Sequence, residues 1–253
     1  MATVDCPDMG TAMGTLTMRY DGADIMAGSS KSYHLQTNWW HTFANETEAY
    51  DGLSFTVSNS QDAGVPSTDG DPMGFPSIFI GAYGGNTTMG SNLPKQVSAL
   101  TSVPTIYETN NSSIGIDNHN ATYDVWFTAN STPLTALQAS PGTGGAYLMV
   151  WMFKPTDRQP RGNDTGRIGK TIAGVPGTWD VWFDNSTNPP CVSYVSSMPI
   201  DGLQFDLNDF IQDAVTNSYG VTSSQYLSIV FGGFEIWDGA DGLSLKQFCA
   251  TVN

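Results

Sequence analysis

Apolar and polar residues alternate along many short stretches of this chain, and residues 224–239 show the pattern most clearly. The stretch is rich in apolar and β-branched residues and ends in Asp238–Gly239, which predicts a β-strand. Side chains point alternately to the two faces of a strand. One face, which we assign to the core, carries Val230, Phe234 and Ile236. The other carries Phe231, Gly233, Glu235 and Trp237, and is suited to a flat, polar, uncharged ligand.

The same alternation predicts several more strands and leaves one segment with helical spacing. Further strands are expected at 13–20, 33–43, 52–58, 76–84, 121–129, 145–153, 178–184, 191–197 and 243–252. Residues 207–217 predict an amphipathic helix, because Leu207, Phe210, Ile211 and Ala214 share one face. Asp206 is the expected N-cap and Gly220 the expected stop.

This order of elements predicts an all-β fold of two packed antiparallel sheets, a sandwich or jelly roll, with one helix. The chain has no internal repeat and no obvious linker, so we expect a single domain over residues 1–253. In segment 145–153, Tyr147, Met149 and Trp151 share one face, and the opposite face is apolar too. A central strand between a core and an aromatic cleft has this composition.

Composition narrows the class of protein. Charged residues make up only 13%, and the net charge is −15, which argues against binding to nucleic acid or to an anionic membrane surface. No apolar run reaches the roughly 18 residues that a membrane helix needs. Gly, Ser, Thr, Asn and aromatic residues are plentiful, as in secreted β-rich proteins. Potential N-glycosylation acceptors are Asn45, Asn86, Asn110, Asn111, Asn120, Asn130, Asn163 and Asn185.

The three cysteines allow at most one internal disulfide, and we expect Cys6 to pair with Cys249 because they lie near the two ends of the chain. The histidines are scattered and show no metal-ligand spacing with the cysteines. We therefore expect neither a metal nor another cofactor.

Glutamate is scarce, with four among 24 acidic residues, and Glu235 is the one inside an apolar strand. A carboxylate there is costly unless it is paired, hydrogen-bonded or facing a cleft. The alternative is an outward Glu on a solvated sheet face.

A second feature is the segment 154–170, which we expect to be a loop and which holds five of the nine basic residues. It is either a solvated loop or a site for an acidic ligand.

Six motifs in order span about 200 residues of the chain. They are Thr37-Asn38-Trp39-Trp40, Tyr123-Asp124-Val125-Trp126-Phe127-Thr128-Ala129, Leu148-Met149-Val150-Trp151, Pro160-Arg161-Gly162, Trp179-Asp180-Val181-Trp182, and Phe231-Gly232-Gly233-Phe234-Glu235 after the helix. Together they resemble glycoside hydrolase family 12, the small endoglucanases and xyloglucanases. The resemblance implies a β-jelly roll whose concave sheet binds a β-glucan chain, in a secreted, monomeric, polysaccharide-active protein.

The resemblance also implies the site residues. Glu235 holds the position of the family's general acid/base, and Asp124 lies beside the position of its nucleophile. The residues implied to line the cleft are Asn38, Trp40, Met149, Trp151, Pro160, Arg161 and Trp237. The sequence departs from the family at the nucleophile, because the pattern Glu-Leu/Ile-Met-Ile/Val-Trp has Tyr147 in place of Glu. A double displacement needs two carboxyl groups about 5–5.5 Å apart, and one is missing.

Four hypotheses follow from this departure. Tyr147 is a nucleophile whose proton Asp124 removes, or Asp124 activates a water in an inverting hydrolysis. In a third, Tyr147 transfers a proton in the β-elimination of a uronic acid, whose charge the basic segment neutralises. In a fourth, the protein binds a glycan without cleaving it, as a lectin-like or decoy protein. We favour cleavage of a plant or fungal cell-wall glycan, and the basic segment suggests a substrate with acidic sugars.

Overall fold

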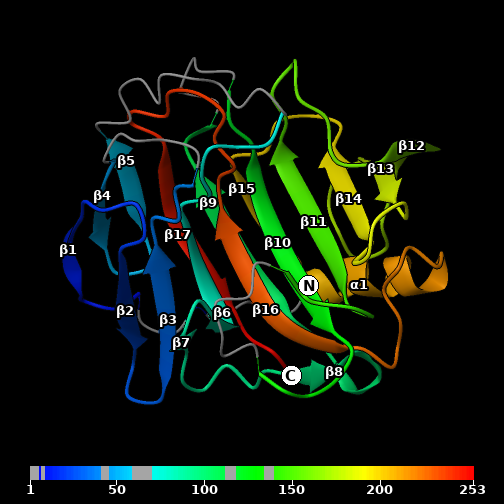
Figure 1. Cartoon of the computed structure of the whole chain (residues 1–253), viewed down its shortest axis with the longest axis horizontal. Helices are drawn as coiled ribbons and strands as arrows, with labels where there is room; N and C mark the ends of the chain where they lie inside the picture. Colours follow the sequence, from blue (N-terminus) through cyan, green and yellow to red (C-terminus); the bar gives the residue numbers. More distant parts are fainter. Residues whose placement is uncertain (1–5, 7–8, 41–45, 59–69, 112–117, 134–139) are drawn as a thin grey trace.

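Two β-sheets packed face to face form the protein in this computed structural model (Figure 1). It describes residues 6, 9–40, 46–58, 70–111, 118–133 and 140–253. The smaller sheet has the order β1 (Met13–Leu16), β4 (Thr47–Asp51), β5 (Phe55–Ser58), β17 (Ser244–Ala250), β9 (Pro104–Thr109) and β15 (Gly202–Asp206).

The larger sheet has the order β12 (Asn163–Lys170), β13 (Trp179–Asp184), β14 (Cys191–Ser196), β11 (Ala146–Phe153), β10 (Ala121–Thr128), β16 (Tyr226–Gly233), β6 (Ser77–Tyr83), β3 (Lys31–Gln36) and β2 (Gly22–Ala27). The short β7 (Asn86–Thr87) pairs with β6, and β8 (Lys95–Gln96) pairs with β16 before the 3₁₀ helix Val97–Ala99. The predicted all-β, two-sheet fold is confirmed. One pair departs from the antiparallel expectation, because β11 and β14 run parallel.

Strand register decides which side chains reach each face of the larger sheet. Asp124 on β10 lies opposite Met149 on β11 and Phe231 on β16. Tyr147 lies opposite Trp126 on one side and Cys191 on the other. These residues share one face because side chains alternate along each strand.

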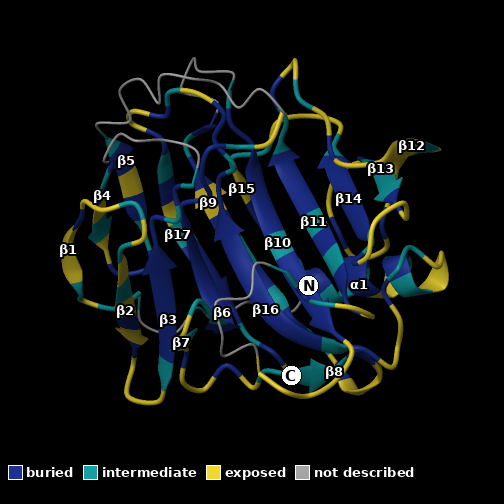
Figure 2. Ribbon diagram, in the orientation of Figure 1, coloured by how far each residue is buried: buried dark blue, intermediate teal, exposed yellow. Residues whose placement is uncertain are grey.

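The main core fills the space between the two sheets. Residues that alternate with the outer-face positions along β10, β11 and β16, such as Val125, Leu148 and Val230, are fully buried in this core. Figure 2 shows the central strands buried along most of their length. The outer face of the larger sheet carries two smaller clusters, one of Phe75, Phe79, Trp126, Ile229 and Phe231, and one of Trp151, Val195 and Trp237. The two apolar faces of β11 predict an aromatic surface of this kind on the outer face of the sheet.

The α-helix among the described residues is α1 (Leu207–Thr216), within the predicted range. Asp206 caps it as predicted, since its side chain accepts a hydrogen bond from the Asn208 amide at 3.0 Å. The helix ends before the predicted stop at Gly220, because Asn217 already leaves the helical conformation. Arg167 on β12 forms a bidentate ion pair with Asp213 on the helix, with both bonds 3.0 Å long.

Two further sequence predictions about elements are wrong. The strand that carries the Phe231 face ends at Gly233, so Glu235 follows it on backbone that forms only isolated bridges, at Ile236. The segment 154–170 is not all loop, because residues 163–170 form β12 at the edge of the sheet. This strand is mostly exposed, so it lacks the apolar alternation that reveals buried strands.

The predicted disulfide is confirmed between Cys6 and Cys249, and Cys191 is a buried free thiol. No helix in the described part of the chain is long and apolar enough to cross a membrane.

Candidate active site

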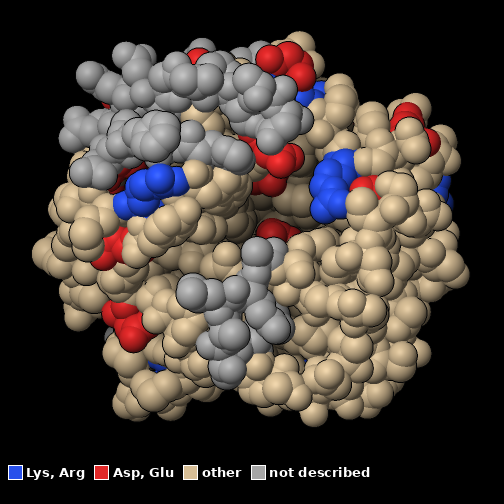
Figure 3. Space-filling view, in the orientation of Figure 1, with Lys and Arg blue, Asp and Glu red and all other residues tan. Residues whose placement is uncertain are grey.

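The outer face of the larger sheet is hollowed over β10 and β11 (Figures 1 and 3). Figure 3 shows Asp and Glu atoms in the hollow and basic atoms on its rim. Asp124 and Tyr147 lie on this face, on the neighbouring strands β10 and β11. The charge of Asp124 raises the pKa of Tyr147 and of Glu235, so both groups lie within its electrostatic reach.

Glu235 is held by Asn120, which precedes β10. The Glu235 backbone N–H donates to Asn120 Oδ1 at 2.8 Å, and the Asn120 backbone N–H donates to the Glu235 carbonyl at 2.9 Å. Asn120 Nδ2 also donates to Glu235 Oε2. Burial raises the pKa of Glu235 to about 8, the charge of Asp124 adds to this, and the bond from Asn120 opposes it. Glu235 is therefore a carboxyl that keeps its proton at neutral pH.

Asp124 lies on β10 at the centre of the site. Its Oδ2 accepts a hydrogen bond of 2.7 Å from the indole N–H of Trp126. Its Oδ1 is buried and accepts no hydrogen bond from the described residues. Burial raises the pKa of Asp124 to about 7, while the Trp126 bond and the charge of Arg161 act in the opposite direction. Asp124 is thus about half ionised near neutral pH.

Tyr147 lies on β11, partly exposed, with its ring edge-on to Trp126 at a centroid distance of 5.5 Å. Burial, followed by the charge of Asp124, raises the pKa of the phenol well above its usual range. Burial also raises the pKa of the neighbouring Cys191 thiol to about 12. Neither group ionises near neutral pH, so both are weak nucleophiles in this setting.

The predicted cleft residues divide by exposure. Trp40 and Met149 are partly exposed, and so is Asn38, whose positive φ of 52° turns the backbone just before Trp39. Trp151 and Trp237 are only 2% and 3% exposed, and their rings pack together at 6.2 Å. These two form the floor of the cleft. The exposed surface there belongs to Met149 and to its partly exposed neighbour, Trp182.

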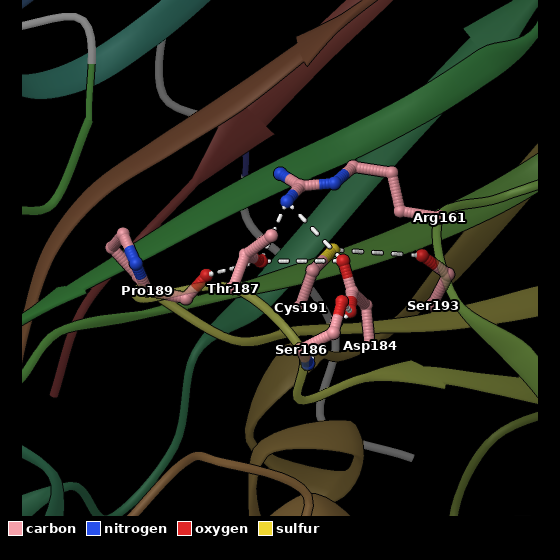
Figure 4. A network of polar contacts seen from close by, with 7 residues as sticks. All are labelled: Arg161, Asp184, Ser186, Thr187, Pro189, Cys191 and Ser193. Carbon is pink, nitrogen blue, oxygen red and sulfur yellow. Dashed lines mark hydrogen bonds and ion pairs between the residues drawn. The ribbon is translucent and has the colours of Figure 1, made fainter.

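The arginines of the basic segment 154–170 contact different parts of the molecule and do not form one site. Pro160 is buried, whereas the Arg161 side chain is 50% exposed and pairs with Asp184 at 3.2 Å and Thr187 at 2.7 Å (Figure 4). Arg167 is turned to the helix, and Arg158 stacks over Trp237 at 5.5 Å. Arg161 is the basic side chain whose charge reaches the site, because it lowers the pKa of Asp124 and of Glu235.

Sequence reasoning missed three residues of the site: Asn120, Trp126 and Asp184. Trp126 could have been found, because it shares a strand face with Asp124. Asn120 gave the opposite signal, since Asn120-Ala121-Thr122 matches a glycan acceptor. Within the described ranges, no three His, Cys, Asp or Glu side chains come together as a metal site would require.

The signature of "Glycosyl hydrolase family 12" matches residues 31–253 of the sequence. The chain belongs to this family. It is 31% identical over 165 residues to the probable cellulase Cel12b of Mycobacterium tuberculosis, which covers 65% of this chain and 100% of that protein. It is 27% identical over 205 residues to the xyloglucan-specific endo-beta-1,4-glucanase A of Emericella nidulans, which covers 78% of this chain and 80% of that protein.

Solved family 12 structures share the fold. The endoglucanase Cel12A of Rhodothermus marinus aligns with a TM-score of 0.80 at 27% identity, covering 95% of this chain and 99% of that one. A metagenome-derived family 12 endoglucanase aligns with a TM-score of 0.80 at 26% identity, covering 96% and 99%. The resemblance to family 12 and the expected jelly-roll architecture are therefore confirmed.

Proposed function

We propose that this family 12 glycoside hydrolase cleaves a β-glucan of plant or fungal cell walls, with Glu235 as the proton donor. Relatives named as a cellulase and a xyloglucan-specific endo-beta-1,4-glucanase support this class of substrate. The observation that carries the proposal is the environment of Glu235. It is a partly exposed carboxyl held by Asn120 and protonated up to a pH of about 8. A general acid for glycoside cleavage needs a raised pKa of this kind.

We further propose that Asp124 is the second catalytic group and that Tyr147 stands where the family's nucleophile Glu is expected. Ionised Asp124 would remove a proton from the attacking water while Glu235 protonates the departing glycosidic oxygen, and the anomeric configuration would invert. The partial exposure of Asp124 and its pKa of about 7 support this role. The raised pKa of the Tyr147 phenol speaks against its acting as the nucleophile.

The test is Glu235→Gln, assayed on soluble β-glucan and xyloglucan by release of reducing ends, with oligosaccharide binding measured in parallel. Loss of cleavage with binding retained is expected, because the amide has the shape of the carboxyl but no proton to transfer. Cleavage at the wild-type rate in Glu235→Gln would refute the proposal. The matched control is Glu108→Gln, an exposed glutamate on β9, which should leave the rate unchanged.

A protein that binds glycans without cleaving them is the second candidate. The observation that favours it is Tyr147 at the expected nucleophile position. The two candidates separate directly: a binder shows oligosaccharide affinity in both wild type and Glu235→Gln but no product in either. Recording absorbance from unsaturated products in the same assay detects the eliminative hypothesis. Anomeric NMR of the products distinguishes inversion from retention.

Acidic sugars in the substrate are a narrower hypothesis, and its support is Arg161. Half of its side chain is exposed, but Asp184 already balances the charge. We propose that a carboxylated sugar would bind beside this guanidinium. Equal turnover of a uronic-acid-containing glycan and its carboxyl-reduced form would contradict the hypothesis.

We also propose that the protein acts outside the cell as a monomer. The disulfide between Cys6 and Cys249 supports secretion, because such bonds persist in oxidising compartments. The proposed substrate, a cell-wall polymer, lies outside the cell, so the protein has to act there.

A further inference from the structure

Asn120 forms three hydrogen bonds with Glu235, although the two residues are 115 positions apart in the sequence. The Asn120 side chain is fully buried, so solvent does not compete for its hydrogen bonds. Two of the contacts join backbone groups of Glu235, and the third joins its carboxyl. Through its backbone N–H and its side-chain amide, Asn120 thus fixes both the backbone and the side chain of Glu235.

The orientation of that amide follows from hydrogen-bond chemistry. The backbone N–H of Glu235 can only donate, so the Asn120 atom that it meets at 2.8 Å has to be the carbonyl oxygen Oδ1. The other atom of the amide, Nδ2, therefore faces Glu235 Oε2. An amide nitrogen only donates, so Oε2 has to be an acceptor without a proton.

We propose that Asn120 is a positioning residue that keeps the transferable proton of Glu235 on Oε1. A carboxylic acid has one O–H and one acceptor oxygen, and a proton on Oε2 would set two donors against each other. Among the described residues, the hydrogen bond to the Glu235 carboxyl is made to Oε2 and not to Oε1, and Glu235 is partly exposed. The proton thus lies on the oxygen that is free to meet the glycosidic oxygen. This inference rests on the proposed role of Glu235 as proton donor.

The test is Asn120→Asp, which keeps the acceptor for the Glu235 backbone N–H and replaces the Nδ2 donor with a carboxyl oxygen. That oxygen attracts the Glu235 proton to Oε2, away from the substrate. We expect kcat to fall about tenfold or more with KM nearly unchanged. We also expect the alkaline limit of the kcat/KM profile to move to higher pH, because a donor that favours ionised Glu235 is gone.

Carboxyl ¹³C NMR titration of Glu235 gives a readout that does not depend on activity, and the expected result is a higher pKa in Asn120→Asp than in wild type. The control is Asn111→Asp, another buried asparagine, which contacts His119 rather than Glu235. Its Glu235 titration should match the wild type. Circular dichroism and Tm identify a variant that fails to fold, and Asn120→Ser, which retains a small polar group, then takes its place.

An unchanged Glu235 titration in folded Asn120→Asp, or an equal shift in Asn111→Asp, would overturn the inference. Failure of the proposed function has a different signature: Glu235→Gln stays active while the Glu235 titration still moves in Asn120→Asp. The two proposals can therefore fail separately.

Discussion

At the scale of single residues, burial rather than charge pairing sets the chemistry of the site. Asp124 and Glu235 have raised pKa values chiefly because the sheet removes water from them. The sequence could single out Glu235 as a candidate, because it is the one glutamate in an apolar stretch. It could not predict Asn120, because contacts between residues so far apart in the chain leave no local pattern.

Tyr147→Phe tests what the phenol does. If Asp124 activates the water, the hydroxyl has no chemical task, and the rate of reducing-end release should stay within about threefold of wild type. The ring would keep its edge contact with Trp126, so Tm should change little. A loss of activity at unchanged Tm would instead assign Tyr147 a role as nucleophile or proton-transfer group.

Tyr147→Glu would place a carboxyl where we expect the family's nucleophile. Beside Glu235 it would permit a double displacement, and the products should change from inverted to retained configuration in anomeric NMR. A variant that is folded, binds oligosaccharide and gives the same product configuration as wild type would contradict this prediction. Tyr147→Gln is the control, because it has a similar shape without the charge.

At the scale of elements, the long central strands of the larger sheet were predictable, and several short or exposed strands, such as β4, β9 and β12, were not. The central strands β10 and β11 match their predicted ranges within one residue at each end. The edge strand β12 was not predicted, because its side chains are exposed and its pairing with β13 is interrupted by bulges. The parallel pairing of β11 with β14 was not predicted for another reason: alternation within a strand does not encode the direction of its neighbour.

A second element-scale feature is a pair of glutamates at the start of β4. Glu48 is fully buried and Glu46 is 3% exposed. Burial raises the pKa of both carboxyls well above the usual range, and their mutual interaction contributes for Glu46. Both folded pKa values exceed the unfolded value of about 4.3. The contribution of this pair to stability is therefore complete below that pH and is lost as the pH rises.

Glu48→Gln should accordingly stabilise the protein at pH 8 and have little effect at pH 4. An amide needs no proton to remain neutral, so the expected gain at pH 8 is about 1 kcal/mol or more. Thermal unfolding at both pH values measures the difference. Glu108→Gln, on an exposed site, should change neither Tm. A Glu48→Gln variant that loses stability equally at pH 4 and pH 8 would show that packing, not ionisation, dominates.

At the scale of the whole molecule, the family resemblance predicted the architecture, and the cysteine positions predicted the cross-link. The Cys6–Cys249 bond joins residues separated by 243 positions and ties the start of the chain to β17 in the smaller sheet. The larger sheet carries the site and the smaller one closes the core behind it. Loss of the bond should therefore lower global stability with little change at the site.

Cys6→Ser combined with Cys249→Ser should destabilise the protein by about 3–5 kcal/mol, mainly because the unfolded chain regains freedom. Thermal or denaturant unfolding measures the loss, and dithiothreitol should lower the Tm of wild type in the same direction. The double variant is its own control, because the reductant should not change it further. A wild-type Tm that is insensitive to reduction would contradict the prediction.

The buried amide of Asn120 has a practical consequence for producing this protein. Its side-chain nitrogen is the atom to which an N-linked sugar would be attached, and Asn120-Ala121-Thr122 is an acceptor tripeptide. The same nitrogen holds Glu235 in the folded state. In a host that glycosylates nascent chains, every molecule modified at this residue would be unable to close its sheet around the carboxyl. Occupancy at this one tripeptide would then set the active fraction of the preparation, and a host without N-glycosylation avoids the loss.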